Sequence, residues 1–212
     1  LQLKRFAGLP LVGPPLPVLL EHGLKVARSS RFERPKQWAR RGYLCMGSLR
    51  AQWLREEHGV PAHAIGPWIR FAQPLLTTDQ IEAQKQLWGK TLLVVLAHSW
   101  DQVERSMDLE ACISAVKELA QNENYQQVVW LRHWKDPEEL PLPKGWVKAC
   151  NGHRSNPWFL DAMRTLLEIS DGLASNAFGT HLGYGVALNN KLHWIDVEPT
   201  QHLQKLSPEK AK

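Results

Sequence analysis

The sequence predicts an α/β protein: a Rossmann-like parallel sheet with flanking helices, preceded by a partial first lobe. Residues 91–97, TLLVVLA, form an unbroken apolar run. Such a run is typical of a central parallel strand that is covered on both faces. In residues 173–196 an apolar pair, a glycine-bearing polar turn, a small-residue amphipathic run and a second apolar stretch follow one another. Strand, turn, helix and strand in this order build a doubly wound sheet.

The order of elements suggests two lobes. We expect residues 1–70 to form the partial amino-terminal lobe, residues 71–200 to form the Rossmann-like domain, and residues 201–212 to form a polar tail. The first lobe should contain three short strands and one helix, at residues 16–20, 43–47, 49–57 (the helix, capped by Ser48 and ended by Gly59) and 60–65.

In the second lobe the apolar periodicity alternates between strand and helix. We expect a helix over 80–88 with Thr78 or Asp79 as its cap, then the strand 91–97, and a clear amphipathic helix over 109–120. The remaining expected strands are 125–131, 146–150 and 173–174, and the remaining expected helices are 159–169 and 182–188.

Composition excludes several classes of protein. The chain has 212 residues, 43% of them apolar, and no apolar run long enough to cross a bilayer. Its three cysteines include no C-x-x-C pair, which argues against a zinc ribbon and favours reduced thiols in a cytoplasm. The net charge of +5 allows anionic ligands or an acidic membrane surface without requiring nucleic acid. No metal-ligand pattern such as H-E-x-x-H is present.

Three successive predicted strands end in polar loops that contain a histidine. These loops hold His98-Ser99, His133 with Asp136, and His153-Arg154. Open α/β sheets bind ligands beyond the carboxyl ends of their strands, so these loops should meet at one edge. The alternative for each histidine is an ordinary loop residue that hydrogen-bonds to its neighbours.

The turn after residues 173–174 concentrates polar side chains and glycine: Ser175, Asn176, Gly179, Thr180 and His181. It precedes a predicted helix, whose N-terminus offers unpaired N–H groups and a partial positive charge. We therefore predict an anion site that holds a ligand phosphate and faces His98. The alternative is that these residues serve only as turn and capping residues.

Glu21-His22-Gly23 follows the first predicted strand. Two titratable side chains beside a glycine at a strand end can serve general acid–base chemistry. A solvated loop with a glycine turn is the competing interpretation.

Together these motifs resemble the carboxyl-terminal part of a GT-B glycosyltransferase. The nearest likeness is to bacterial capsule and lipopolysaccharide enzymes that use CMP-activated Kdo or sialic acid. The resemblance rests on Glu21-His22-Gly23, on His98-Ser99, and on the final S-N-x-F-G-T-H-L-G-Y-G. It implies that the donor phosphate is bound by His98, Ser99, Ser175, Asn176 and Thr180, with His153, Arg154, Gly179 and His181 in the same donor site. It also implies that Glu21 and His22 lie near the acceptor, with the acidic residue acting as base.

The function implied is metal-independent transfer of a sugar from a nucleotide donor, CMP-sugars being favoured, to a cell-surface polysaccharide or glycolipid. The nucleotide sugar is a substrate, and no cofactor is expected. The implied location is the cytoplasm, and association with the periphery of the inner membrane stays open. Because the first lobe is short, the alternative is a non-catalytic nucleotide or sugar-nucleotide binding module, or a remnant that works with a partner chain. The two readings differ on Glu21, which should face the cleft in an enzyme. A phosphate hydrolase is disfavoured because the chain lacks clustered aspartates.

Overall fold

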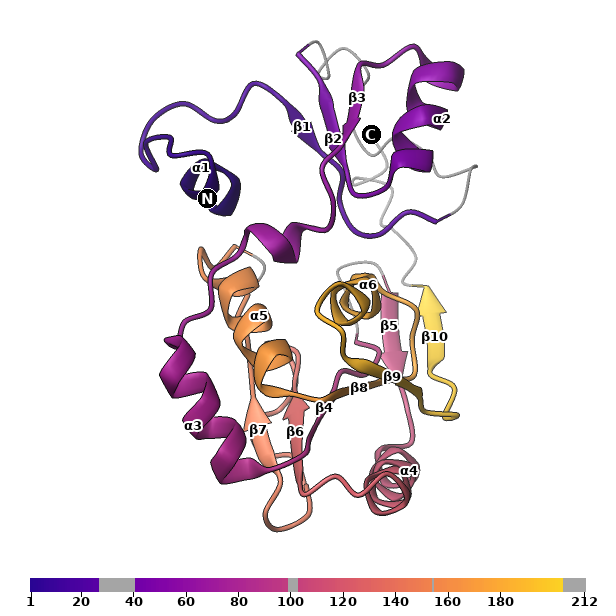
Figure 1. Cartoon of the computed structure of the whole chain (residues 1–212). Helices are drawn as coiled ribbons and strands as arrows, with labels where there is room; N and C mark the ends of the chain where they lie inside the picture. The colour runs from indigo at the N-terminus through magenta and orange to yellow at the C-terminus, as the bar shows by residue number, and fades with distance from the viewer. Residues whose placement is uncertain (27–40, 99–102, 154, 204–212) are drawn as a thin grey trace.

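A computed structural model describes residues 1–26, 41–98, 103–153 and 155–203 of the chain. It shows an α/β protein with a three-stranded and a five-stranded parallel sheet, and a separate antiparallel pair of strands. The smaller sheet lies in the first 70 residues and the larger one between residues 91 and 194. Figure 1 shows the small sheet above the large one, with the connecting 3-10 helix η2 (Trp68–Phe71) between them.

The first lobe consists of β1 (Leu19–Leu20), β2 (Tyr43–Cys45), α2 (Ser48–His58) and β3 (Ala62–Ala64). Its small core includes Leu54, which is fully buried. Gly59 ends α2 in the left-handed region at φ 61°, as predicted. The prediction that Ser48 caps this helix is wrong, because Ser48 is its first residue and Gly47 stands at the cap position without a side-chain bond.

A short helix at the start of the chain, α1 (Gln2–Phe6), was not predicted from the proline-rich sequence around it. It packs against the second lobe. Arg5 forms an ion pair with Asp161 at 2.7 Å, and the Phe6 ring lies edge-on to Phe71 with 4.9 Å between centroids. Asp161 is almost completely buried and also accepts a hydrogen bond from the N–H of Gln73 at 2.8 Å. The first 26 residues therefore contact both lobes.

The large sheet contains five parallel strands in the order β7-β6-β4-β8-β9. Their bounds are β4 (Thr91–Val94), β6 (Gln127–Leu131), β7 (Val147–Ala149), β8 (Gly172–Ser175) and β9 (Lys191–Trp194). Numbered along the chain, the order is 3-2-1-4-5, which is that of a doubly wound sheet. The direction of winding reverses between β4 and β8, the first and fourth strands.

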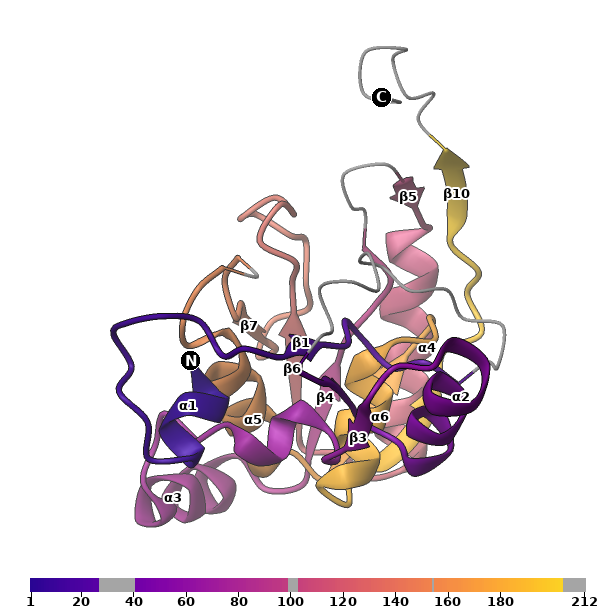
Figure 2. The same ribbon diagram turned by 90° about the horizontal axis from the view of Figure 1, so that it is seen from above.

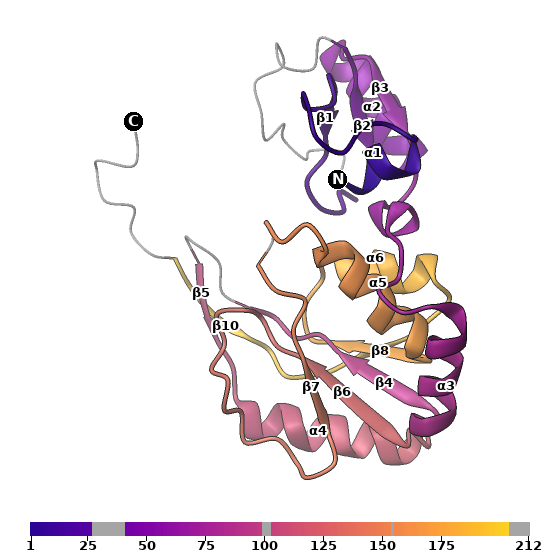
Figure 3. The same ribbon diagram turned by 90° about the vertical axis from the view of Figure 1, so that its left-hand side faces the viewer.

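Helices cover both faces of this sheet, as Figure 3 shows. On one face α4 (Leu109–Asn122) packs against Leu92 and Val94. On the other face α5 (Phe159–Ile169) and α6 (Thr180–Ala187) pack against Leu93, whose side chain points the opposite way because strand residues alternate. The helix α3 (Thr78–Trp88) lies outside α5.

The central strand confirms the buried interior position predicted from the apolar run, but it ends at Val94, three residues earlier than predicted. Residues 91–94 are all buried, β4 has a parallel partner on each side, and none of residues 91–97 is exposed. The predicted cap of α3 is wrong by one or two residues. Thr77 is the cap, and it forms a capping box with Gln80, in which each side chain accepts a bond from the other residue's backbone N–H.

The antiparallel pair was not predicted. It joins β5 (Val103–Ser106) to β10 (Thr200–Leu203), and Figure 2 shows that it projects away from the rest of the second lobe. Residues 201–203 of the predicted tail therefore belong to a strand, and residues 204–212 lie outside the described residues. Within the described ranges, no helix combines the length and the apolar character that crossing a bilayer requires.

Candidate functional site

The two strands at the reversal point carry the predicted site loops on their carboxyl ends. His98 follows β4, and residues 176–179 follow β8 and lead into α6. The side-chain oxygen of Asn176 accepts a hydrogen bond from the N–H of Ala97 at 2.8 Å, which holds the two loops together. In doubly wound sheets this reversal point is where ligands bind. The predicted placement of both loops at one edge agrees with this geometry.

Ser175 and Asn176 have structural partners in this turn. Asn176 is 3% exposed, and its amide nitrogen donates to the carbonyl oxygen of Val197 at 2.9 Å. Ser175 is fully buried, and its hydroxyl lies 2.8 Å from Nε2 of His181 and 3.0 Å from the carbonyl oxygen of Ala177. Their polar groups thus shape the turn, and neither side chain presents a free donor at the surface. Both residues were predicted to supply donors to a ligand, whereas in this structure their donors bond within the protein.

His181 lies in the first turn of α6 and packs against Gly179. A Cβ at Gly179 would approach the imidazole within 2.8 Å, so a glycine is needed for this close packing. Burial, and to a lesser degree the nearby His98, lowers the pKa of His181 to about 4. His181 is therefore neutral at pH 7, and it lies close enough to His98 for that residue to lower its pKa. This effect of His98 on the pKa of His181 agrees with the prediction that the turn lies near His98.

The three histidine loops meet at the same edge. The rings of His98 and His133 stack face to face, with 4.1 Å between centroids and 4° between planes. Trp134 lies edge-on to His153 at 4.7 Å. Burial, followed by the proximity of His98, lowers the pKa of His133 to about 4. Two other predicted site residues, Ser99 and Arg154, lie outside the described residues.

The first lobe touches this site through the loop after β1. The hydroxyl of Thr180 accepts a hydrogen bond from the N–H of Leu24 at 3.1 Å. Gly23 lies beside it at φ 73°, and a Cβ there would stand 3.2 Å from the Thr180 hydroxyl. Glycine therefore provides both the left-handed backbone and the close approach. The sequence signal for this contact was the glycine of Glu21-His22-Gly23, although its partner could not be read from the chain.

Glu21 has a different environment from the one expected of a catalytic base. It is 3% exposed, and its carboxylate accepts a hydrogen bond from Nε of Arg50 at 2.7 Å. Its carbonyl oxygen accepts a bond from the indole N–H of Trp68 at 3.1 Å. The buried carboxylate thus holds α2 against the loop, and the backbone carbonyl oxygen of the same residue holds η2. His22, in contrast, is exposed and lies next to the Gly23 that contacts Thr180.

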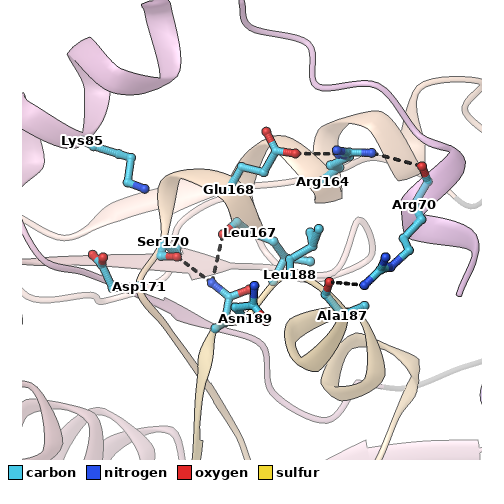
Figure 4. Close-up of a pocket in the computed structure, with 11 residues that line it drawn as sticks. Arg70, Lys85, Arg164, Leu167, Glu168, Ser170, Asp171, Ala187, Leu188 and Asn189 are labelled. Carbon is cyan, nitrogen blue, oxygen red and sulfur yellow. Dashed lines mark hydrogen bonds and ion pairs between the residues drawn. The ribbon is translucent and has the colours of Figure 1, made fainter. Parts of the chain in front are cut away.

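A cavity of about 610 Å³ lies at the opposite, amino-terminal edge of the sheet. Figure 4 shows its lining, in which Lys85 of α3, Arg164 of α5 and Arg70 of η2 surround the carboxyl ends of α5 and α6. Arg164 is fixed by a 2.6 Å ion pair with Glu168. Sequence reasoning did not find this cavity, because it is formed where four elements distant in the chain meet.

Asn190, beside this cavity, closes the end of α5. Its amide nitrogen donates to the carbonyl oxygens of Leu167 at 2.9 Å and Ser170 at 2.5 Å, which the helix itself leaves unpaired. The preceding Asn189 adopts a left-handed backbone at φ 64° and ends α6. The Asn189-Asn190 pair therefore has a capping role that accounts for its place in the sequence.

The described residues contain no group of three or more histidine, cysteine, aspartate or glutamate side chains arranged to hold a metal ion. The reversal point brings His98 and the start of α6 together at one edge of the sheet. The first intrahelical bond is donated by Leu182 to Gly179 at 3.1 Å, so the N–H groups of Thr180 and His181 precede it. No protein-family model, no curated protein and no solved structure matches this chain.

Proposed function

We propose that the protein binds a nucleotide-activated sugar at the β4–β8 reversal point and transfers the sugar to a cell-surface glycan or glycolipid, as GT-B enzymes do. One observation carries the proposal. The strand order brings His98 and the N-terminus of α6 together at the reversal point, where a loop of the first lobe contacts Thr180 through Leu24. A nucleotide site that touches a separate lobe is what a two-substrate transferase requires.

The main requirement of this reaction is that the protein stabilises the negative charge of the leaving phosphate. The acceptor hydroxyl attacks the anomeric carbon, the bond from that carbon to the donor phosphate breaks, and the phosphate leaves with the electron pair. The N–H groups at the start of α6 and the His98 imidazole would stabilise this leaving group. Because Glu21 is paired with Arg50, His22 is the better candidate to accept the proton of the acceptor hydroxyl.

Calorimetric titration with CMP-, UDP-, GDP- and ADP-sugars tests the donor site. At least one should bind, and Thr180→Val should weaken that binding by about three- to tenfold, because a hydroxyl at the start of α6 is lost. Thr78→Val is the matched control, since Thr78 is also the first residue of a helix but lies on α3. Equal affinities of the two variants, or no binding of any nucleotide, would refute the donor site.

The second candidate function is a nucleotide-binding module without catalysis. The Glu21–Arg50 ion pair favours it, because it occupies the acidic residue expected to act as base. The two functions differ in turnover. An enzyme releases free nucleotide from the sugar donor when an acceptor is present, and a His22→Ala variant should lose this release while keeping affinity. Binding without release, in the presence of a mixture of glycan acceptors, would support the module.

A further inference from the structure

The cavity at the amino-terminal edge of the large sheet has a mostly polar lining. Its volume is about 610 Å³, and eight of the eleven residues that line it are polar or charged. The charged ones are Arg70, Lys85, Arg164, Glu168 and Asp171. The carboxyl ends of α5 and α6 complete the wall, as Figure 4 shows. Such a lining suits a small polar molecule, because an apolar ligand would displace water from the charged groups without replacing its hydrogen bonds.

The two acidic side chains of the lining already have partners. Glu168 forms the 2.6 Å ion pair with Arg164, and a carboxylate oxygen of Asp171 accepts a hydrogen bond from the N–H of Thr91 at 2.8 Å. Arg164 also donates to the carbonyl oxygen of Ala72 at 2.8 Å. These bonds fix the wall of the cavity, and they leave both carboxylates committed to groups other than the two remaining bases.

Lys85 and Arg70 are these two bases, and neither has an acidic partner in the part of the chain that the structure describes. The Lys85 side chain, which is half-buried, makes no hydrogen bond to the described residues, and Arg70 makes one, at 3.3 Å to the carbonyl oxygen of Ala187. Figure 4 shows the two on opposite sides of the cavity, with the Lys85 ammonium pointing inward. A ligand that neutralises both cations therefore needs two separated anionic groups.

The wall between the two cations presents acceptors of hydrogen bonds. Asn190 lines the cavity and is 8% exposed, and its amide nitrogen is used by Leu167 and Ser170. Its side-chain oxygen has no hydrogen-bond partner among the described residues. The last carbonyl groups of α5 and α6 add a partial negative charge. Because an unpaired buried acceptor is unfavourable, a ligand with N–H donors between its anionic groups would be stabilised here.

The anionic groups of the ligand should be carboxylates rather than phosphates. Phosphates are typically bound at helix N-termini, where free N–H groups and a partial positive charge coincide. This edge of the sheet holds the carboxyl ends of α5 and α6 instead, which repel additional negative charge. A carboxylate carries a single charge and forms strong hydrogen bonds with lysine and arginine side chains. Two carboxylates at the two ends of the cavity thus satisfy the cations with the least charge near the helix ends.

We infer that this cavity binds a short acidic peptide. Its two carboxylates pair with Lys85 and Arg70, and its backbone N–H groups donate to Asn190 and to the helix ends. A peptide unites the two required features, because it carries separated acidic side chains with a row of N–H donors between them. The inference goes beyond the proposed function, since the cavity lies at the carboxyl end of α6 and the proposed nucleotide site at its beginning.

The test titrates the full chain by calorimetry with the acetylated and amidated tetrapeptide Glu-Gly-Gly-Glu. Two further probes each lack one recognised feature. The blocked tetrapeptide Gln-Gly-Gly-Gln keeps the N–H groups without the charges, and sebacate keeps two separated carboxylates without donors. The acidic peptide should bind, and each of the other two should bind at least about tenfold more weakly. Absence of peptide binding, or equal affinity for either of the other probes, would overturn the inference.

Substitutions at the two cations locate the peptide. Lys85→Gln and Arg70→Gln should each weaken it by about three- to tenfold, because each removes one ion pair. Lys85→Gln should keep the wild-type melting temperature, since the side chain makes no bond within the described structure. Lys117→Gln is the matched control, because Lys117 is also a helical lysine but lies on α4, which covers the other face of the sheet. An equal loss of affinity in this control would refute binding in the cavity.

Titration of the same variants with nucleotide sugars separates this inference from the proposed function. Lys85→Gln should leave nucleotide-sugar affinity unchanged, and Thr180→Val should leave peptide affinity unchanged, because the two sites lie at opposite edges of the sheet. A protein that binds the peptide but no nucleotide sugar would refute the donor site alone. Wild-type peptide affinity in both Lys85→Gln and Arg70→Gln would refute the peptide site alone.

Discussion

Lowering the pH from 7.5 to 5 should destabilise the fold through His181. In the folded protein its pKa is about 4, mainly because of burial, whereas an unperturbed histidine has a pKa of about 6.5. Between these two values the unfolded chain binds a proton that the folded protein does not. The free energy of unfolding therefore falls as the pH drops below 6.5 and stops falling near pH 4. Above pH 6.5 the residue has no such effect.

The size of the effect follows from the two pKa values. At pH 5 the linkage relation gives a loss of about 2 kcal/mol for this one imidazole. His133, with its pKa also near 4, contributes in the same direction. His181→Gln removes the titrating group and can still hydrogen-bond to Ser175. Its free energy of unfolding should therefore depend on pH less steeply than that of the wild type, by about 2 kcal/mol between pH 7.5 and 5.

Urea unfolding at half-unit steps of pH measures both slopes. The control is His63→Gln, because His63 is exposed on β3 and meets solvent in both states; it should keep the wild-type dependence. If wild type and His181→Gln lose the same free energy of unfolding between pH 7.5 and 5, then His181 is not held neutral by burial. The packing of the His181 ring against Gly179 would then not lower the free energy of unfolding at acid pH.

Three more substitutions test other parts of the structure. His98→Ala should reduce nucleotide affinity by about 1–3 kcal/mol in calorimetry with little change in melting temperature; a large loss of stability at unchanged affinity would contradict a ligand role. Gly172→Ala should destabilise the fold by about 1–3 kcal/mol in urea, because the new methyl group would meet the Tyr125 ring, and a wild-type unfolding midpoint would refute this. Asp161→Ala should cost about 3–5 kcal/mol, since it leaves Arg5 unpaired, and a loss below about 1 kcal/mol would show that the pair is not a strong link.

Local pattern was sufficient for most of the large sheet. The run TLLVVLA predicted a buried central strand because only a strand with two neighbours and two covered faces tolerates so many consecutive apolar residues. The meeting of the histidine loops was also predictable, since parallel strands end at a common edge. The short pair β5–β10 was not, because its polar residues carry no alternation of apolar and polar positions that would indicate a strand.

The roles of individual polar residues needed the tertiary structure. Ser175 and Asn176 were predicted as ligand donors, but the partners that occupy them, His181 and Val197, come into reach only when α6 and β9 fold back. The pairing of Glu21 with Arg50 is equally invisible in the chain, where 29 positions separate them. A polar residue type shows that a bond is needed, and the fold decides whether that bond is made internally or to a ligand.

The helix α1 gives the first lobe two tethers. One is the segment that runs from α1 to β1, and the other is the segment from β3 through η2. Because the ion pair of Arg5 and Asp161 attaches α1 to α5, the first lobe is connected to the second at both of its ends. Between these attachments, the bond from the N–H of Leu24 to the Thr180 hydroxyl adds a non-covalent contact between the lobes. A protease cut in residues 7–18 would leave the chain of the first lobe joined to the second lobe at η2 alone. The fragment that contains α1 would stay associated with α5 through the ion pair of Arg5 and Asp161.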